Sequence, residues 1–300
     1  MHKYAKLLSK ISEQLNVNSV QLTDEELYEK ELCEDSLYEF GKRAWKVIEG
    51  TDFIEGWHIE IICAHLEALY DLEISDLLIN QPFRTGKSMF GAVIYPAWIW
   101  TQDPTESFLY TSYAQTFSVR DSIKCRRLVQ SPWYQHLWGN TVKLRPDVQN
   151  KLNFELQAGG YRLASSVDGS NTGGGANFIV SDDPNNIRDV ESEVTRQNTN
   201  EWWDNVMPSR YKLLKDRRRL VIQQRSHTND LSGHILAKDD PSWIHLCLPM
   251  EFEKFERCAT IPLRITDGKV WKDPRTRDGQ LLWKEGVDAR GLQKLKKSLT

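Results

Sequence analysis

Short apolar runs alternate with longer helical patterns along most of this 300-residue chain. The runs are LLIN at 77–80, SFLYTSY at 107–113, FIVS at 178–181 and RLVIQQ at 219–224. A helical pattern follows each of the first three runs. Strands that alternate with helices in this way pack as a mostly parallel sheet with helices on both faces. The sequence therefore predicts an α/β fold of this type.

The remaining segments predict further elements. Helices are expected over 1–50 in two parts, over 57–70 as an amphipathic helix, over 89–102, 114–130 and 190–206, and at the end of the chain. In the first part the residues at helical spacing are Leu7, Leu8, Ile11 and Leu15, and the second part begins near Ser36. Residues 151–157 and 161–165 predict a hairpin that turns at Gly159-Gly160, and 243–252 predicts a last strand.

Composition places the chain among ordinary globular proteins. Hydrophobic residues make up 40% and charged residues 27%, which allows a sizeable core. Five scattered cysteines without a C-x-x-C pair argue against a disulfide framework and a zinc site. No stretch reaches about 18 consecutive apolar residues, and the polar N-terminus lacks a signal-peptide core. With a net charge of −3, any surface for nucleic acid must be local.

The segment QPFRTGKS (81–88) lies between a predicted strand and a predicted helix, which is the setting of a phosphate-binding loop. It ends in the Gly-Lys-Ser of G-x-x-x-x-G-K-[ST], but Gln81 stands where that motif has its first glycine. In such a loop Gly86 allows close backbone approach, Lys87 reaches the β- and γ-phosphates, and the Ser88 hydroxyl binds Mg²⁺. An incomplete motif can also arise by chance.

A second candidate, FIVSDD (178–183), is an apolar strand that ends in two carboxylates. Asp182 is placed to hold Mg²⁺ through water, and Asp183 to orient and deprotonate an attacking water. The same aspartates, with the Pro-Asn-Asn that follows, are also good turn formers. The order of the two motifs, with a strand–helix unit between them, favours a nucleotide site over a simple turn.

The fourth predicted strand also ends in polar residues, VIQQRSHTND (221–230). Ligands of open α/β sheets gather at the carboxyl ends of the strands. Gln224 is therefore a candidate sensor of the γ-phosphate or of the attacking water. Arg225 is a candidate contact for phosphate or for the two carboxylates. A solvated strand end is the alternative interpretation.

These motifs together resemble the ATPase domain of large terminase subunits, the DNA-packaging motors of tailed bacteriophages. The resemblance is spread over most of residues 55–295. QPFRTGKS resembles the divergent phosphate loop of that family, which also lacks the first glycine. The other matching segments are WHIEIICAHLEAL (57–69), similar to an upstream helix with a His near the adenine, YPAWIWTQDP (95–104), SNTGGGANFIVSDDPNN (170–186) and the coupling-motif match VIQQRSHTNDLSGHIL (221–236).

The resemblance implies a P-loop NTPase fold of the ASCE type and Mg²⁺-dependent hydrolysis of ATP to ADP and phosphate. The motifs and the resemblance together give Asp183, Arg84, Lys87 and Gln224 as the catalytic candidates, although Gln224 stands where the family's coupling motif usually has Thr. The nucleotide-binding candidates, from the motifs and the resemblance together, are Gln81, Pro82, Phe83, Arg84, Thr85, Gly86, Lys87, Ser88, His58 and Arg225, with Ser88 and Asp182 at the metal. His58, the adenine-side candidate, can equally be a core residue.

Two departures from the family pattern affect the expected mechanism. Many members have Asp-Glu where this chain has Asp182-Asp183, so the shorter base must lie closer to the water. Many members also supply an arginine finger from the loop before the carboxylate strand, but 172–175 is Thr-Gly-Gly-Gly. The source of a finger is therefore open among Arg120, Arg126, Arg127 and Arg210.

The resemblance also implies partners and a domain organisation. The partners are double-stranded DNA, a portal protein, a small terminase subunit and further copies in a ring of about five, with the isolated domain monomeric and no membrane. The location is the cytoplasm of a bacterial host and the procapsid portal. Residues 1–50 are expected to form a helical extension, 51–285 the ATPase domain, and 286–300 the start of a linker toward a nuclease domain absent from this chain.

Other interpretations remain open. Candidate DNA contacts are Lys124, Arg126, Arg127 and the basic run 215–219, each of which can instead be a solvated surface. A helicase-like or DNA-repair ATPase would share the loop and the carboxylates, but we find no further helicase motifs. A nucleotide-binding assembly module without hydrolysis would fit the shorter Asp183 and the missing arginine.

Overall fold

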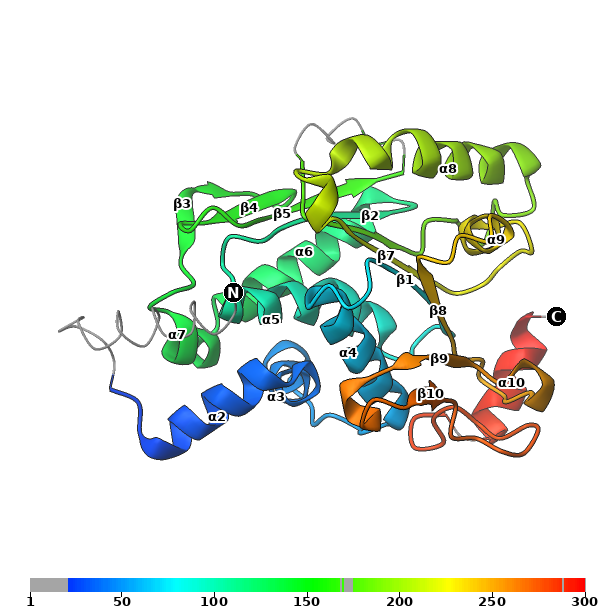
Figure 1. Ribbon diagram of the computed structural model, residues 1–300, viewed down its shortest axis with the longest axis horizontal. Helices are drawn as coiled ribbons and strands as arrows, with labels where there is room; N and C mark the ends of the chain where they lie inside the picture. The colour runs from blue at the N-terminus through cyan, green and yellow to red at the C-terminus, as the bar shows by residue number, and fades with distance from the viewer. Residues whose placement is uncertain (1–20, 168, 170–174, 288, 300) are drawn as a thin grey trace.

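The computed structural model describes residues 21–167, 169, 175–287 and 289–299 (Figure 1). Its helices are α2 (Asp24–Asp35), α3 (Leu37–Glu49), α4 (Trp57–Tyr70), α5 (Tyr95–Gln102), α6 (Gln115–Val129), α7 (Pro132–Trp138), α8 (Glu193–Asn205), α9 (Leu231–Ala237) and α10 (Ala289–Leu299), with a π-helix over Met89–Ile94. Its strands are β1 (Asp76–Asn80), β2 (Ser107–Ser112), β3 (Leu144–Gln149), β4 (Asn153–Leu156), β5 (Tyr161–Ser166), β6 (Phe178–Asp182), β7 (Arg218–Gln223), β8 (Trp243–Cys247), β9 (Ala259–Pro262) and β10 (Val270–Lys272). The helix expected around 7–15 lies outside the described residues. No helix of the described part is long and apolar enough to cross a membrane.

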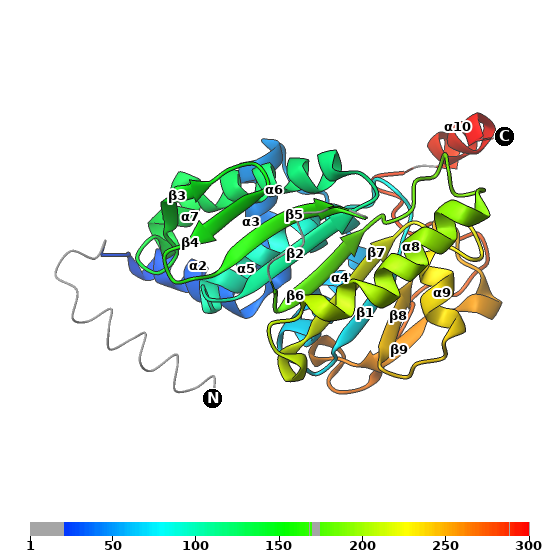
Figure 2. The same cartoon turned by 90° about the horizontal axis from the view of Figure 1, so that it is seen from above.

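In the described part of the chain, eight strands form one sheet in the order β3-β4-β5-β2-β6-β7-β1-β8 (Figure 2). Neighbours from β5 to β8 pair in parallel, and β3, β4 and β5 pair antiparallel at one edge. The predicted mostly parallel sheet and the predicted β4–β5 hairpin are confirmed. β7 lies between β1 and β6, which is the order of an ASCE-type P-loop fold. Because these strands are parallel, their carboxyl ends meet at one edge of the sheet.

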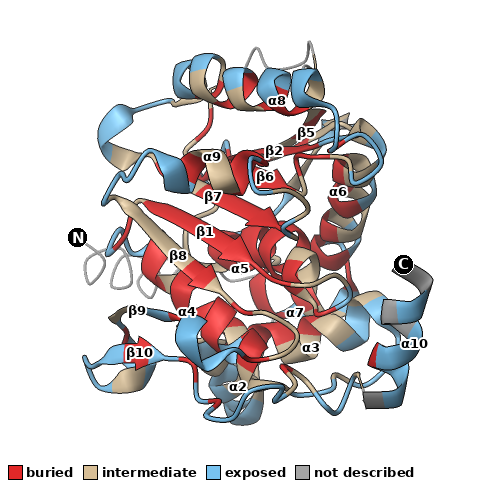
Figure 3. Ribbon diagram, turned by 90° about the vertical axis from the view of Figure 1, so that its right-hand side faces the viewer, coloured by how far each residue is buried: buried red, intermediate tan, exposed pale blue. Residues whose placement is uncertain are grey.

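The sheet is apolar on both faces because side chains along each strand alternate between two helical layers. Leu77 and Ile79 of β1 belong to the larger core cluster, which includes residues of α3 to α6. Leu78 packs instead with Trp203 of α8 and Leu231 of α9. Figure 1 shows α8 and α9 on one side of the sheet and α3 to α6 on the other, and Figure 3 shows β1 and β7 buried between these layers. Helices on both faces are therefore confirmed.

The helix expected over 57–70 is present as α4, but the prediction that it is amphipathic is wrong. All of its residues except Trp57, Glu60 and Glu67 are buried. Helix α3 packs against α4, and the hairpin of β9 and β10 covers another part of it, where His65 Nε2 lies 2.9 Å from the Thr260 hydroxyl. Because this hairpin comes so much later in the chain, the local pattern of α4 cannot indicate it.

The helix expected directly after the 81–88 loop begins as a π-helix and continues as α5. Pro96 has no N–H to donate to the Ala92 carbonyl four residues earlier. The buried guanidinium of Arg162 donates to that oxygen instead, at 3.1 Å. Gly91 lies against β7, where a Cβ would come 2.2 Å from Ile222 Cδ1. The segment is therefore held close to the sheet directly after the loop.

Other boundaries differ from the expected ones for local reasons. The segment SPWYQHLWG (131–139), which would close the helix expected over 114–130, forms a separate helix, α7, because the Ser131 hydroxyl caps it and Pro132 occupies its first turn. The last expected strand, 243–252, ends at Cys247. The helices expected over 114–130 and 190–206 are confirmed as α6 and α8. The sequence patterns do not predict β3, α9 or the β9–β10 hairpin.

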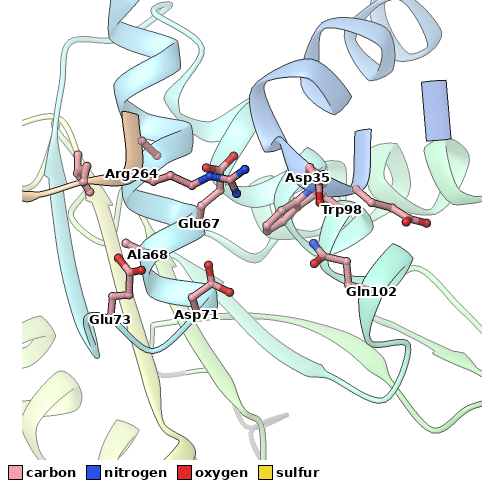
Figure 4. Close-up of a pocket in the computed structure, with 11 residues that line it drawn as sticks. Asp35, Glu67, Ala68, Asp71, Glu73, Trp98, Gln102 and Arg264 are labelled. Atoms are coloured by element: carbon pink, nitrogen blue, oxygen red, sulfur yellow. The ribbon is translucent and has the colours of Figure 1, made fainter. Parts of the chain in front are cut away.

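A cavity of about 150 Å³ lies at the C-terminal end of α4, next to the start of β1, whereas the 81–88 loop follows the opposite end of that strand (Figure 4). The Glu67 side chain points into it together with Asp71, Glu73 and Arg264. The Glu67 carboxylate accepts the Leu37 N–H at 2.7 Å and so caps the start of α3. Burial raises the pKa of Glu67 to about 7.

Glu67 gives a pH-dependent contribution to stability whose sign follows from its raised pKa. In the unfolded chain this carboxyl titrates near its ordinary value of 4.5, so the folded state binds the proton more tightly. The contribution of Glu67 is therefore largest below about pH 4.5 and falls as pH rises to about 7. We expect Glu67→Gln to reduce the loss of unfolding free energy between pH 5 and pH 8 by about 2 kcal/mol. Urea unfolding at the two pH values measures this loss. Glu60→Gln, at an exposed position of the same helix, is the control, and equal pH profiles for both variants would contradict the assignment.

Candidate functional site

The 81–88 loop leaves the carboxyl end of β1 and leads into the π-helix. Arg84 (φ 58°) and Gly86 (φ 87°) both have left-handed backbone conformations. Glycine is required at 86, because a Cβ there would be strained and would lie 2.8 Å from Ile59 Cδ1. The Thr85 hydroxyl donates to the Pro82 carbonyl at 2.6 Å and closes the turn. Arg84 is a non-glycine residue held in an uncommon conformation, as is frequent at ligand sites.

Lys87 and Asp183 meet across the edge of the sheet. The Lys87 ammonium lies 2.8 Å from Asp183 Oδ2, and the lysine side chain is only 4% exposed. The other oxygen of Asp183 accepts the Gln224 backbone N–H at 2.9 Å. Asp183 itself has a positive φ of 46°. The carboxylate is therefore fixed by groups from the loop and from the end of β7.

Ser88 and Asp182 form the second contact between the two motifs. The Ser88 hydroxyl donates to Asp182 Oδ1 at 3.0 Å. Asp182 is buried, and this burial raises the pKa of its carboxyl above the ordinary range although Lys87 opposes the shift. A hydroxyl and a carboxylate side by side are oxygen ligands of the kind that Mg²⁺ prefers, together with water and phosphate oxygens. The residues present therefore fit a Mg²⁺ ion bound with a nucleotide phosphate.

Two cavities open beside these groups. One, of about 440 Å³, includes Asp182, Asn185 and the Gln224 side chain in its lining, and the other, of about 430 Å³, includes Lys87 and Arg84. The residues that line both are Phe83, Ser88, Arg120 and Asp183. The carboxylates and the lysine therefore lie where a ligand has access to them from both sides.

A smaller cavity of about 110 Å³ lies behind the loop and contains the adenine-side candidate. His58 shares its lining with Trp45, Phe53, Trp283 and the loop residues Arg84 to Gly86. Burial lowers the pKa of His58 to about 4, so the ring is neutral at pH 7. Nε2 lies 3.2 Å from the Thr85 carbonyl and is therefore the protonated nitrogen. Nδ1 is then an acceptor, and it has no partner among the described residues.

Three predicted nucleotide-binding residues, Gln81, Pro82 and Arg225, have surroundings that differ from the predicted ones. Gln81 is buried, and neither atom of its side-chain amide has a partner among the described residues. The Pro82 carbonyl serves the turn already described. The Arg225 guanidinium binds Asp230 at 3.0 Å and the carbonyls of His227 and Thr228, and Arg225 lines none of the three cavities around the loop. The structure therefore does not bring Arg225 to Asp182 and Asp183.

Sequence reasoning missed a buried polar network directly behind the site. The Gln223 side chain donates to Asn185 Oδ1 at 3.0 Å and accepts from the backbone N–H and the hydroxyl of Ser232. Asn80 donates to the same hydroxyl at 2.8 Å and lies 2.8 Å from His245 Nε2. Gln223 lies two residues after the buried Val221, on the same face of β7. A polar side chain at that position of a buried strand is the signal that could have identified it.

Two of the basic residues proposed as DNA contacts are engaged inside the fold. The Arg218 guanidinium lies 3.3 Å from the Glu106 carboxylate and donates to the Tyr70 carbonyl, and Arg219 pairs with the buried Asp76. Both lie at the start of an interior strand, where neighbouring elements cover them. The prediction that Arg218 and Arg219 are available to contact DNA phosphates is therefore wrong. Lys124 pairs with Glu49 at 2.6 Å, whereas Arg127 is exposed.

No protein-family model matches the chain, and no curated protein matches it. Among solved structures, the chain is similar to the large terminase of bacteriophage HK97, with 17% identity over 71% of this chain and 44% of that one, at a TM-score of 0.42. It is also similar to the large terminase of a thermophilic bacteriophage in complex with ADP, with 11% identity over 64% of this chain and 44% of that one, at a TM-score of 0.39. The chain thus spans less than half the length of either protein. Both are phage large terminases, the family whose motifs this sequence resembles.

Proposed function

We propose that this chain is the ATP-hydrolysing motor domain of a phage large terminase subunit, which drives double-stranded viral DNA into a procapsid. The observation that carries the proposal is the meeting of two motifs that lie far apart in the sequence. The Ser88 hydroxyl is 3.0 Å from Asp182, and the Lys87 ammonium is 2.8 Å from Asp183. A chance Gly-Lys-Ser has no reason to meet two strand-end carboxylates. The packaging role is supported by the resemblance of the motifs.

The geometry suggests how nucleotide binding prepares the base. Lys87 and Asp183 now neutralise each other. A nucleotide phosphate competes with Asp183 for the ammonium and leaves this carboxylate free to accept a proton from water. The Gln224 N–H keeps the other carboxylate oxygen in place during this exchange. Ser88 and Asp182 would hold Mg²⁺, which supplies neutralising charge at the phosphoryl group when bound.

The cavity at His58 is the proposed site of the adenine base. Aromatic side chains supply stacking surfaces there, and the unpaired Nδ1 can accept a hydrogen bond from an amino group. We expect His58→Ala to weaken ADP binding about tenfold, because the Thr85 carbonyl also loses its donor. Titration with a fluorescent ADP analogue measures this, with the half-exposed His136→Ala as the control. Unchanged affinity in His58→Ala would mean that this histidine is a core residue only.

Domain limits and partners are part of the same proposal. Residues 51–285 would form the ATPase domain, 1–50 a helical extension and 286–300 the start of a linker. Double-stranded DNA, a portal protein and a small terminase subunit would be the partners, in the cytoplasm of the host and at the procapsid. The isolated chain would be a monomer, so light scattering is expected to give a mass near 34.9 kDa rather than that of a ring.

The experiment that tests the function is steady-state phosphate release from Mg-ATP, with and without linear duplex DNA. Release that rises with duplex DNA supports a motor domain. Nucleotide binding without release would favour an assembly module, for which the engagement of Asp183 by Lys87 is the supporting observation. Strand separation of a fluorescent duplex during hydrolysis would favour a helicase-like ATPase instead.

A further inference from the structure

We infer that Arg120 is a catalytic residue of the same chain and that it contacts the terminal phosphoryl group of the nucleotide. This inference rests on the proposed ATPase function and deepens it. It concerns the one cation among the described residues that lines both large cavities beside Asp183.

The fold brings Arg120 to the site through the end of β2. The Tyr113 N–H donates to the Asp183 carbonyl at 3.2 Å, so the chain entering α6 is bonded to the carboxylate loop. Arg120 lies in the second turn of α6, which begins at Gln115. Its side chain lines the cavity with Asp182 and Gln224 and also the cavity with Lys87. Arg120 therefore shares a cavity with Lys87, which would bind the phosphate, and with Asp183, which would orient the attacking water.

The guanidinium of Arg120 donates hydrogen bonds from only one of its edges. Its Nε and Nη2 donate to the two oxygens of Asp121 at 2.8 and 3.2 Å. The Nη1 group has no partner among the described residues, and the side chain is 53% exposed. Asp121 is nearly buried and so fixes one edge of the guanidinium, while the ring of Phe117 lies 5.3 Å from its central carbon. The free edge can donate to phosphate oxygens while Asp121 still holds the other edge.

The other candidate arginines lack this placement. Arg126, Arg127 and Arg210 line neither cavity. Of the two large cavities, the exposed Arg188 lines only the one that contains Asp182 and Gln224, and Arg84 lines only the one that contains Lys87. A positive charge between the attacking water and the phosphate is the position where an arginine finger stabilises the developing charge. Arg120 can therefore supply from the same chain the arginine that the glycine-rich loop lacks.

Two measurements on Arg120→Ala test the inference. Phosphate release is expected to fall by about 100-fold or more, because one charge-stabilising donor is lost. Binding of a non-hydrolysable ATP analogue is expected to weaken about tenfold while ADP binding is unchanged, since only the terminal phosphate loses a contact. Arg145→Ala, at a half-exposed arginine paired with Asp147 on β3, is the matched control. Arg120→Lys keeps the charge without the planar fork and is expected to recover only part of the release.

Mixing variants separates action within one chain from action between chains. Arg120→Ala mixed with Asp183→Asn is expected to stay inactive, because each chain lacks one essential group of its own site. Recovery of release in the mixture would show that Arg120 acts on a neighbouring copy and would overturn the inference. So would an Arg120→Ala protein that matches Arg145→Ala in both measurements. If wild type releases no phosphate, the proposed hydrolysis fails, but a selective loss of ATP-analogue affinity in Arg120→Ala still supports the contact.

Discussion

Replacing Asp183 by Asn is expected to lower ATP turnover by roughly 10²- to 10⁴-fold, the usual effect of removing a general base. Asparagine has nearly the same shape and keeps one oxygen to accept the Gln224 N–H. It cannot take a proton from water, so the chemical step fails while the fold is preserved. Because Lys87 is then released from its carboxylate partner, ATP affinity is expected to stay equal to that of wild type or to increase.

Phosphate release and nucleotide titration measure the two parts of this prediction. Asp189→Asn is the control, because Asp189 follows in the same segment but is exposed. Lys87→Ala is expected to lose both turnover and affinity, since it removes the phosphate contact itself. Turnover near the wild-type value in Asp183→Asn would place the base elsewhere and would contradict the proposed mechanism.

Arg218→Ala is expected to destabilise the protein by about 3–5 kcal/mol, because it leaves the partner of a buried ion pair without compensation. Arg218 lies between Glu106 and the Tyr70 carbonyl, with its guanidinium 4.6 Å from the centre of the Phe178 ring. The Glu106 carboxyl is already buried, and burial raises its pKa. Losing the arginine removes both the opposing charge and the packing that the guanidinium provides.

Urea unfolding measures the free energy of unfolding of Arg218→Ala, and Arg217→Ala serves as the control. Arg217 is 37% exposed and lies 3.6 Å from Asp76, so its replacement is expected to cost less than about 1 kcal/mol. Both residues belong to the basic run that the sequence offered as a DNA contact. If Arg218→Ala kept wild-type stability and lost only DNA binding, the structural role described for Arg218 would be wrong.

Much of the candidate site was predictable because its parts are local. A strand, a loop ending in Gly-Lys-Ser and a helix are adjacent in sequence, and FIVSDD combines its strand and its carboxylates in six residues. The rule that ligands gather at strand carboxyl ends is enough to join these parts into one site. That rule cannot tell Gln223 from Gln224, because the direction of each side chain depends on the strand's register within the sheet. The roles of these residues in catalysis stay predictions.

Local patterns were enough to predict the parallel strands of the sheet and most of the helices, since apolar periodicity and crossover connections depend on neighbours along the chain. They did not predict β3, β9 or β10. Which polar groups are free depends instead on the packing of segments that are distant in the sequence. Arg218 and Arg219 look like available cations in the sequence, yet carboxylates from distant segments engage both. The burial of α4 also depends in part on a distant segment, the β9–β10 hairpin near the other end of the chain. Pairing and burial depend on contacts between segments far apart in sequence, which a local pattern does not record.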